Sequence, residues 1–375
     1  MTLREKYTKQ AKRWIIKIGS ALLTKDGKGL DYTAIEDWTQ QIAQLRQQGI
    51  EVILVSSGSV AEGMSRMGWT SRPTKLAELQ AAAAIGQTGL IEAYETQFKK
   101  HRIQAAQILL THDDISNRKR YLNARNTLHA LLKFKALPII NENDTVALEE
   151  MRLGDNDTLA ALVANLVEAH LLVILTDQEG LFNKDPRHHN DAILINEESA
   201  SNTDLLKYVG DIATTLGSGG MATKLIAAQR AARSGCATVI ASGREDKVLQ
   251  RLSQGEEIGT LLIPDSSQIV ARKQWIIGQV QANGTLFLDQ GATQAILTKG
   301  TSLLSVGVDK AEGQFNRGDV VDCKSPDGIV VARGLVNYSN IEVCKIYNTP
   351  SKKIAKILGY NGEAELIHRN NMVII

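Results

Sequence analysis

The chain of 375 residues has few of the residues that mark a disulfide scaffold or a zinc module. Its three cysteines, Cys236, Cys323 and Cys344, are odd in number, far apart and without a Cys-x-x-Cys pair. This usage is typical of the reducing cytoplasm, where we expect the protein to reside. The polar segment 1–13 lacks the apolar core of a signal peptide, and no apolar run reaches the length of a membrane span. We therefore expect no membrane association.

Excess charge and catalytic histidine motifs are also scarce. Lys and Arg number 43 against 41 Asp and Glu, so the net charge of +2 points neither toward nor away from an anionic partner. The chain contains no His-Glu-x-x-His motif and no visible Ser-His-Asp set, which disfavours a metalloprotease or a serine hydrolase. What remains is an ordinary globular composition, 43% hydrophobic and 22% charged, with length enough for two domains.

Apolar strand-like segments alternate with helix-like segments in the first two thirds of the chain. Almost every strand is continuously apolar, which is typical of a largely parallel sheet sandwiched between helices. The predicted fold class is therefore α/β. Strands are expected at 13–18, 51–59, 103–110, 137–140, 171–177, 237–241 and 259–263, and helices at 31–48, 75–100, 113–134, 159–166 and 224–234.

The pattern changes after Pro264. Short strands separated by glycines run from residue 275 to about residue 343, which indicates a small β-barrel or β-sandwich. The sequence thus predicts an α/β domain at 1–264, a linker at 265–274 and a small β domain at 275–375.

The segment 141–158 is unusually rich in short acids and amides. It lies between an expected buried strand and an expected helix, a place where open α/β sheets bind ligands. One such residue could serve as the N-cap of the helix, but a cap does not explain seven. The segment therefore predicts a ligand site, formed by Asn141, Glu142, Asn143, Asp144, Asp155, Asn156 and Asp157.

Two lysines lie beside glycine-containing turns. Lys17 interrupts the first apolar strand, where a buried ammonium group needs a partner, and Gly19 follows it. The run 216–224, Leu-Gly-Ser-Gly-Gly-Met-Ala-Thr-Lys, precedes a helix and carries Lys224 into its first turn. Backbone N–H groups at such a helix start bind phosphate, although this run is not a Walker motif. Together these features favour a phosphate site.

Taken together, the motifs resemble those of the glutamate 5-kinases, a family of the amino acid kinase superfamily. Relatives that act on aspartate, carbamate or nucleotides share the glycine loop and the first lysine, but not the paired 141–144 and 154–157 motifs. The resemblance spans essentially the whole chain and implies an amino acid kinase fold followed by a β-barrel-like PUA domain. Its motifs are Lys17-Ile18-Gly19, Ser57-Gly58, Asn141-Glu142-Asn143-Asp144, Gly154-Asp155-Asn156-Asp157, Thr176-Asp177 with Gly180-Leu181, and Gly217 to Lys224.

The resemblance implies transfer of the γ-phosphoryl group of ATP to the side-chain carboxylate of L-glutamate, the first step of L-proline synthesis. Mg²⁺ is expected on the nucleotide rather than in a metal site of the protein. Feedback inhibition by L-proline, with competition at the glutamate pocket, is expected as well. A homo-oligomer is also expected, and Gly86 and Gly89 within the helix 75–100 indicate close packing against another helix or subunit.

The same resemblance implies a role for each residue at the site. The catalytic candidates are Lys17, Lys224, Asp157 and Asn141. The expected glutamate contacts are Ser57, Gly58, Asp144, Asp155 and Asn156. The expected ATP contacts are Lys17, Gly19, Thr176, Asp177, Ser218, Gly219, Gly220, Met221, Ala222, Thr223 and Lys224.

The chemistry agrees with these roles. A glutamate carboxylate, with a pKa of about 4.3 in solution, is already a nucleophile at neutral pH, so no general base is required. The two lysines are expected to offset phosphate charge, and one or more of the aspartates to pair with the α-ammonium group. Ser20-Ala21, Ser56 and Ala222 depart from the usual family residues, but these exchanges keep side-chain size.

A nucleic acid-binding function is the alternative, because PUA-like domains of RNA-modifying enzymes bind RNA. Residues 271–375 carry twelve Lys and Arg against nine Asp and Glu, a net charge of +3, densest at Lys352, Lys353 and Lys356. This charge is thin for a nucleic acid footprint, which normally shows a clear basic stripe. A charge run of this kind is usually a solvated face, so RNA binding is the less favoured alternative.

Overall fold

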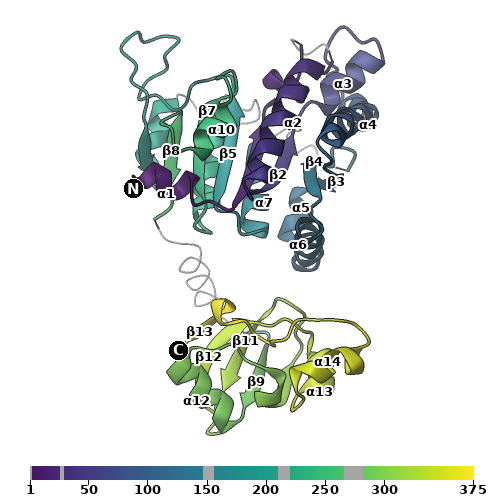
Figure 1. Ribbon diagram of the computed structural model, residues 1–375, viewed down its shortest axis with the longest axis vertical. Helices are drawn as coiled ribbons and strands as arrows, with labels where there is room; N and C mark the ends of the chain where they lie inside the picture. The colour runs from purple at the N-terminus through teal and green to yellow at the C-terminus, as the bar shows by residue number, and fades with distance from the viewer. Residues whose placement is uncertain (1, 26–28, 147–155, 210–219, 266–281) are drawn as a thin grey trace. The chain divides into compact units, whose positions relative to one another are not determined.

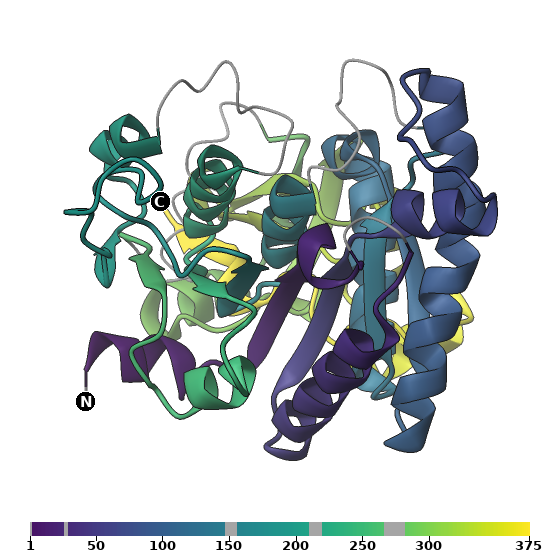
Figure 2. The same ribbon diagram turned by 90° about the horizontal axis from the view of Figure 1, so that it is seen from above.

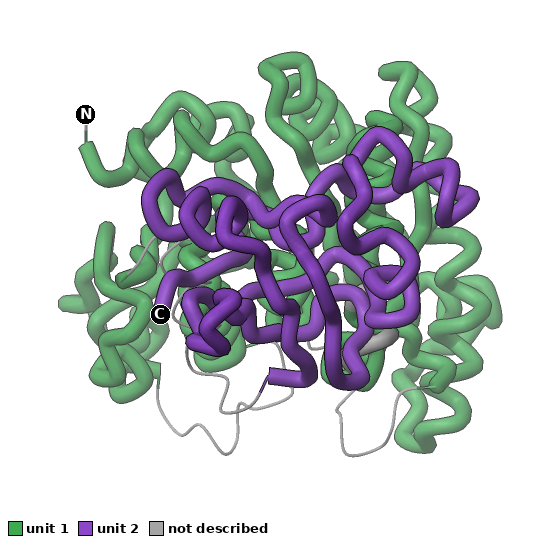
Figure 3. The backbone as a smooth tube through the Cα atoms, turned by 90° about the horizontal axis from the view of Figure 1, so that it is seen from below, with its two compact units in different colours: residues 1–268 green, residues 269–375 purple. Residues whose placement is uncertain are grey.

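The computed structural model describes residues 2–25, 29–146, 156–209, 220–265 and 282–375 (Figure 1). The chain divides into two compact units, residues 1–268 and 269–375 (Figure 3). The expected linker 265–274 lies outside the described residues beyond Asp265. No helix in the described ranges has the length and apolar character required to cross a membrane.

The first unit is built on one eight-stranded sheet with the order β3-β4-β2-β1-β5-β7-β8-β6. Neighbouring strands run parallel except for β7 and β8, which are antiparallel. The predicted α/β class with a largely parallel sheet is therefore confirmed. The strands are β1 Arg13–Ile18, β2 Glu51–Ser56, β3 Ala105–Leu110, β4 Leu137–Glu142, β5 Leu171–Thr176, β6 Glu197–Ser199, β7 Ala237–Ser242 and β8 Thr260–Ile263.

Helices cover both faces of this sheet (Figure 2). Alternate residues of each central strand enter opposite cores: Trp14, Ile16 and Ile18 pack with α2, α4 and α10, whereas Ile15 packs with α6, α7 and α9. Two buried faces require apolar residues at successive positions, which explains the continuous apolar runs. These helices are α2 Tyr32–Gln47, α4 Leu76–Lys100, α6 Arg118–Lys133, α7 Asn156–Leu166, α9 Met221–Ala232 and α10 Val248–Ser253.

Some elements differ from the sequence-based expectation. The single helix expected at 113–134 is two helices, α5 His112–Ser116 and α6, because the side chain of Asn117 caps α6 at the backbone N–H of Arg120, 3.2 Å away. The short elements α1 Leu3–Thr8 and α3 Ser59–Arg66 were not expected. Of these, α3 bears directly on the site, because it starts immediately after β2 and Gly58.

The glycines of α4 are explained by packing within the chain. A Cβ atom on Gly86 would lie 1.8 Å from the carbonyl oxygen of Ser59, and one on Gly63 would lie 1.8 Å from that of Ala82. A Cβ atom on Gly89 would meet the Arg66 guanidinium at 2.4 Å. Of the two alternatives, a helix or a subunit, α3 of the same chain is thus the partner in contact. Close contact with α4 sets the position of the α3 N-terminus.

The second unit has a separate five-stranded sheet with the order β10-β9-β11-β12-β13. All pairs are antiparallel except β9 with β11. One core joins the sheet to its helices α12 Gln290–Lys299, α13 Asn340–Ile346 and α14 Ser351–Leu358. Its strands are β9 Gly284–Leu288, β10 Val308–Gly313, β11 Val320–Lys324, β12 Val330–Leu335 and β13 Met372–Ile374.

Candidate functional site

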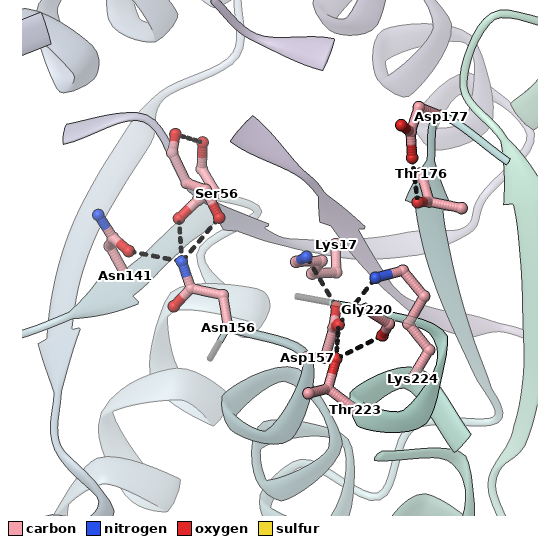
Figure 4. A network of polar contacts seen from close by, with 11 residues as sticks. Lys17, Ser56, Asn141, Asn156, Asp157, Thr176, Asp177, Gly220, Thr223 and Lys224 are labelled. Carbon is pink, nitrogen blue, oxygen red and sulfur yellow. Dashed lines mark hydrogen bonds and ion pairs between the residues drawn. The ribbon is translucent and has the colours of Figure 1, made fainter. Parts of the chain in front are cut away.

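The candidate site lies at the carboxyl ends of the central parallel strands β4, β2, β1 and β5. Their carboxyl ends meet at one edge of the sheet, because the strands are parallel and adjacent. The N-termini of α3, α7 and α9 reach the same edge and carry Ser59, Asn156 with Asp157, and Lys224. Figure 4 shows two polar centres here, one around Asn156 and one around Asp157.

The lysine centre consists of Lys17, Asp157, Thr223 and Lys224. The Nζ atom of Lys17 lies 2.7 Å from Oδ1 of Asp157, and the Nζ atom of Lys224 lies 3.1 Å from Oδ2. The hydroxyl of Thr223 lies 2.9 Å from Oδ2 and 2.8 Å from the carbonyl oxygen of Gly220, and these two acceptors share its one proton. All three charged side chains are buried. The two cations and one anion leave the lysine centre with one net positive charge.

Burial and pairing act against each other on these charges. Burial opposes ionisation of Asp157, but Lys17 and Lys224 outweigh it, so the pKa of this carboxyl lies below its ordinary value. Burial also lowers the pKa of the Lys224 ammonium group, and the nearby Asp157 offsets only part of that effect. Burying ions is costly unless they are paired with good geometry. Asp157 thus holds both ammonium groups in place.

The amide centre is organised by Asn156. Its Nδ2 group donates to the carbonyl oxygen of Ser56 at 3.0 Å, to Oγ of Ser57 at 2.9 Å and to Oδ1 of Asn141 at 3.0 Å. Asn141 in turn donates from Nδ2 to Oε1 of Gln87 at 2.8 Å. Oδ1 of Asn156 is buried and accepts no hydrogen bond from the part of the chain that the structure describes. A buried acceptor without a donor is costly, which fits a ligand that brings a donor.

A pocket opens beside the amide centre. Asp144 is buried in its wall and accepts a 3.3 Å hydrogen bond from the hydroxyl of Ser59. Burial raises the pKa of Asp144 to about 6. Gly58, at φ +107°, turns the chain from β2 into α3 in a conformation that favours glycine. The lining residues are Ser20, Ser57, Gly58, Ser59, Val60, Ala61, Arg72, Asn141, Glu142, Asp144 and Asn156.

Most of the expected glutamate contacts line this pocket. Ser57, Gly58, Asp144 and Asn156 do so, together with Asn141. Asp155 lies outside the described residues. Pairing of an aspartate with the α-ammonium was expected for the acids as a group. Within this group, Asp144 faces the pocket, whereas Asp157 is engaged with the lysines.

The expected ATP contacts are distributed along the sheet edge. Thr176 and Asp177 lie at the end of β5, joined by a 3.1 Å hydrogen bond, and they are separate from both centres (Figure 4). The N–H of Gly19 donates to the carbonyl oxygen of Leu175 at 3.3 Å, which ties the turn after β1 to β5. Gly220 is the N-cap of α9, and Met221, Ala222, Thr223 and Lys224 form its buried first turn. Ser218 and Gly219 lie outside the described residues.

Several lining residues were missed by sequence reasoning. Ser20 and Ser59 adjoin the recognised motifs, so extending each motif by one residue would have found them, whereas Glu142 belongs to the predicted ligand segment 141–158. Gln87 and Arg72 carry no local signal, since they reach the site only through the packing of α3 on α4 and through the loop between these helices.

The structure describes two further features that bear on function. The described residues contain no group of three or more His, Cys, Asp or Glu side chains arranged to hold a metal ion. Lys352, Lys353 and Lys356 are exposed on α14, whose Ile354 is buried. A helix with one buried apolar face and exposed lysines is an ordinary solvated helix.

Comparisons with known proteins agree with this geometry. The model of the amino acid kinase family matches residues 12–242, and the model of the PUA domain matches residues 284–358. Glutamate 5-kinase of Thioalkalivibrio sulfidiphilus is 60% identical over 375 residues, covering 100% of both chains. The glutamate 5-kinases of Marinomonas sp. and Pseudomonas fluorescens are 59% and 57% identical, each again covering 100% of both chains.

Proposed function

The chain belongs to the amino acid kinase family and, within it, to the glutamate 5-kinases, and we propose how its two polar centres divide their reaction. The reaction is the ATP-dependent phosphorylation of the side-chain carboxylate of L-glutamate, the first step of L-proline biosynthesis. In our proposal the pocket beside Asn156 binds glutamate, and the lysine centre stabilises the phosphoryl group during transfer.

Glutamate binding follows from the charges and hydrogen-bonding groups of the pocket. Asp144 is a buried carboxylate in its wall and is suited to pair with the α-ammonium group. Oδ1 of Asn156 supplies a second acceptor for that ammonium group. The hydroxyl of Ser57 and the first N–H groups of α3 can donate to carboxylate oxygens. The side-chain carboxylate of the substrate then points toward the lysine centre and attacks the γ-phosphorus without a general base.

The lysine centre supports the second half of the proposal. Phosphoryl transfer needs positioning and charge stabilisation more than covalent participation by the protein. Lys17 and Lys224 supply that charge, and Asp157 fixes their ammonium groups 2.7 and 3.1 Å from its oxygens. We propose that Thr176, Asp177 and the turn into α9 bind the rest of the nucleotide. Mg²⁺ on the ATP phosphates would neutralise further charge, in keeping with its preference for phosphate oxygens.

One observation carries the proposal. Asn156 and Asp157 are consecutive residues in the first turn of α7, and each organises a different centre. A single helix start therefore holds the acceptor pocket next to the positive centre, as a direct transfer between two bound substrates requires.

The substrate test is an assay of ADP release with L-glutamate, L-aspartate, N-acetyl-L-glutamate and UMP as acceptors. The proposal expects turnover with L-glutamate and little or none with the other three. Comparable turnover of aspartate or UMP would contradict the assignment of the pocket. The variant Lys207→Ala is a matched control for substitutions of the site lysines, because Lys207 is exposed and pairs only locally with Asp204.

Three further expectations belong to the same proposal. L-Proline shares the α-ammonium and α-carboxylate groups of glutamate, so we propose that it inhibits by competing for the pocket; inhibition unaffected by glutamate concentration would contradict this. A homo-oligomer stays a prediction for sedimentation analysis. The α4 glycines do not bear on it, because α3 of the same chain occupies their space. A cytoplasmic location is proposed from the cysteine usage, with all three cysteines free.

A further inference from the structure

The residues proposed above to bind glutamate do not pair with all three of its charged groups. Glutamate brings one ammonium group and two carboxylates, and only its side-chain carboxylate is directed at the lysine centre. The α-carboxylate therefore needs its own partner. Two acids, Glu142 and Asp144, line the pocket, and Arg72 is the one cationic side chain among its described lining residues.

Arg72 belongs to the loop between α3 and α4. Arg72 lines the same pocket as Asp144. Burial raises the pKa of that carboxyl group, and the charge of Arg72 opposes this effect in part. Ser20 lines the same pocket, and it follows Gly19 and the strand that carries Lys17. Arg72 in the pocket wall and the lysines on Asp157 are thus separate cations, one available for each carboxylate of the substrate.

We propose that Arg72 binds the α-carboxylate of L-glutamate while the neighbouring Asp144 binds its α-ammonium group. The inference rests on the proposed glutamate pocket and adds a specificity-determining residue to it. A guanidinium presents parallel N–H donors that match a carboxylate in a bidentate pair, which an ammonium group cannot reproduce. Arg72 and Asp144 together would select substrates in which a carboxylate and an ammonium group share one carbon atom.

The role differs from that of the site lysines. Arg72 contacts a part of glutamate that does not react, so its interaction is equally strong in the ground state and in the transition state. Such uniform binding changes KM and leaves kcat unaltered. Lys17 and Lys224, beside the transferring group, act on kcat instead.

The first test measures the variants Arg72→Gln and Arg72→Lys under steady-state conditions. For Arg72→Gln we expect KM for glutamate to rise at least about 10-fold, as losing a charged hydrogen-bond partner commonly does, with kcat and KM for ATP unchanged. Arg72→Lys should recover only part of the affinity. Lys75→Gln is the matched control, because Lys75 lies on the same loop, is 80% exposed and pairs with Glu78 outside the pocket. An unchanged KM in Arg72→Gln, or an equal change in Lys75→Gln, would overturn the inference.

The second test uses 4-aminobutanoate, which is glutamate without its α-carboxylate, as a competitor against glutamate. The unsubstituted protein should bind it at least about 10-fold more weakly than glutamate, and Arg72→Gln should bind the two about equally. If Arg72→Gln weakens binding of both compounds to the same extent, Arg72 does not contact the α-carboxylate. Failure of the unsubstituted protein to phosphorylate glutamate would instead overturn the proposed function, so the two failures are distinguishable. Arg72 is exposed on a loop, and an unaltered Tm would show that the variants fold normally.

Discussion

The lysine centre and the glutamate pocket are held by neighbouring residues of α7, but they differ in how fully their charges and hydrogen bonds are satisfied. In the lysine centre, both carboxylate oxygens of Asp157 face a buried ammonium group, at 2.7 and 3.1 Å. In the pocket, buried Asp144 accepts a 3.3 Å hydrogen bond, and Oδ1 of Asn156 has no donor among the described residues. The charges of the lysine centre are paired within the protein, whereas the acceptors of the pocket are open to the donors of the proposed substrate.

The two centres therefore use charge for different purposes: the lysine centre for stabilising a transferring group, and the pocket for binding a ligand. A preorganised centre costs folding free energy, since its ions are desolvated, but it needs no rearrangement during the reaction. An incomplete pocket leaves acceptors that a ligand with matching donors can satisfy. Substitutions in the lysine centre should therefore lower stability and kcat, whereas substitutions around the pocket should chiefly change the affinity for glutamate.

Asp157→Asn should produce the largest effect. The substitution leaves the buried ammonium groups of Lys17 and Lys224 without their anion, which commonly costs about 3–5 kcal/mol of unfolding free energy. Urea unfolding followed by circular dichroism measures this loss. Asp185→Asn, in a pair whose Arg187 is exposed, is the control and should cost less than about 1 kcal/mol. Similar losses in both variants would show that Asp157 is not the partner that stabilises the lysines.

Lys224→Ala should lower kcat by about 100-fold or more, because interactions that stabilise developing charge usually have this magnitude. KM for glutamate should change little, since in the proposed arrangement the α-carboxylate and α-ammonium groups bind to Arg72 and Asp144. Steady-state kinetics at saturating ATP separate the two parameters. A kcat within about threefold of the unsubstituted protein would remove Lys224 from the charge-stabilising role.

Gly86→Ala should disturb the pocket through packing. The added Cβ atom would lie 1.8 Å from the carbonyl oxygen of Ser59, so α3 must shift, at a cost of about 1–3 kcal/mol. Since Ser59 lines the pocket, KM for glutamate should rise while KM for ATP stays constant. Thr88→Ala, at an exposed position of the same helix, is the control. Equal effects on both KM values would indicate general destabilisation rather than a displaced α3.

The packing of α3 on α4 could not be predicted from the sequence, although the sheet could. The continuous apolar runs of β1 and β5 predicted a parallel sheet covered on both faces, because a strand that is buried on both faces needs apolar residues at successive positions. By contrast, α3 has few apolar residues and was missed, although its contact with α4 positions Ser59. With only eight residues, α3 is too short for its apolar spacing to be distinguished from that of a loop in the sequence.

The site residues likewise fall into those that a local sequence pattern predicts and those that only the folded chain brings together. The polar run that includes Asn141, Asp144 and Asn156 could be found because so many short polar residues rarely follow a buried strand. The pairing of Asp157 with Lys17 and Lys224 could not, since it depends on where α7, α9 and β1 converge in space. Arg72 was not found for the same reason: its place in the pocket depends on a loop and not on a motif.

The smallest expected effect concerns the pH dependence of glutamate binding. It tests whether the buried Asp144 of the pocket titrates, in contrast to Asp157, which is paired with two lysines. Burial raises the pKa of Asp144 to about 6 from an ordinary 3.8, so kcat/KM for glutamate should fall as the pH drops through about 6 and the carboxylate becomes protonated. In the complex, the α-ammonium group favours the ionised carboxylate, so the acid limb of kcat should lie at lower pH. For folding the sign is opposite: ionising this buried group costs stability, so the ligand-free protein should lose stability as the pH rises from about 4 to about 6. Asp144→Asn should remove that loss and the limb near pH 6 together, whereas an acid limb retained in Asp144→Asn would assign it to another group.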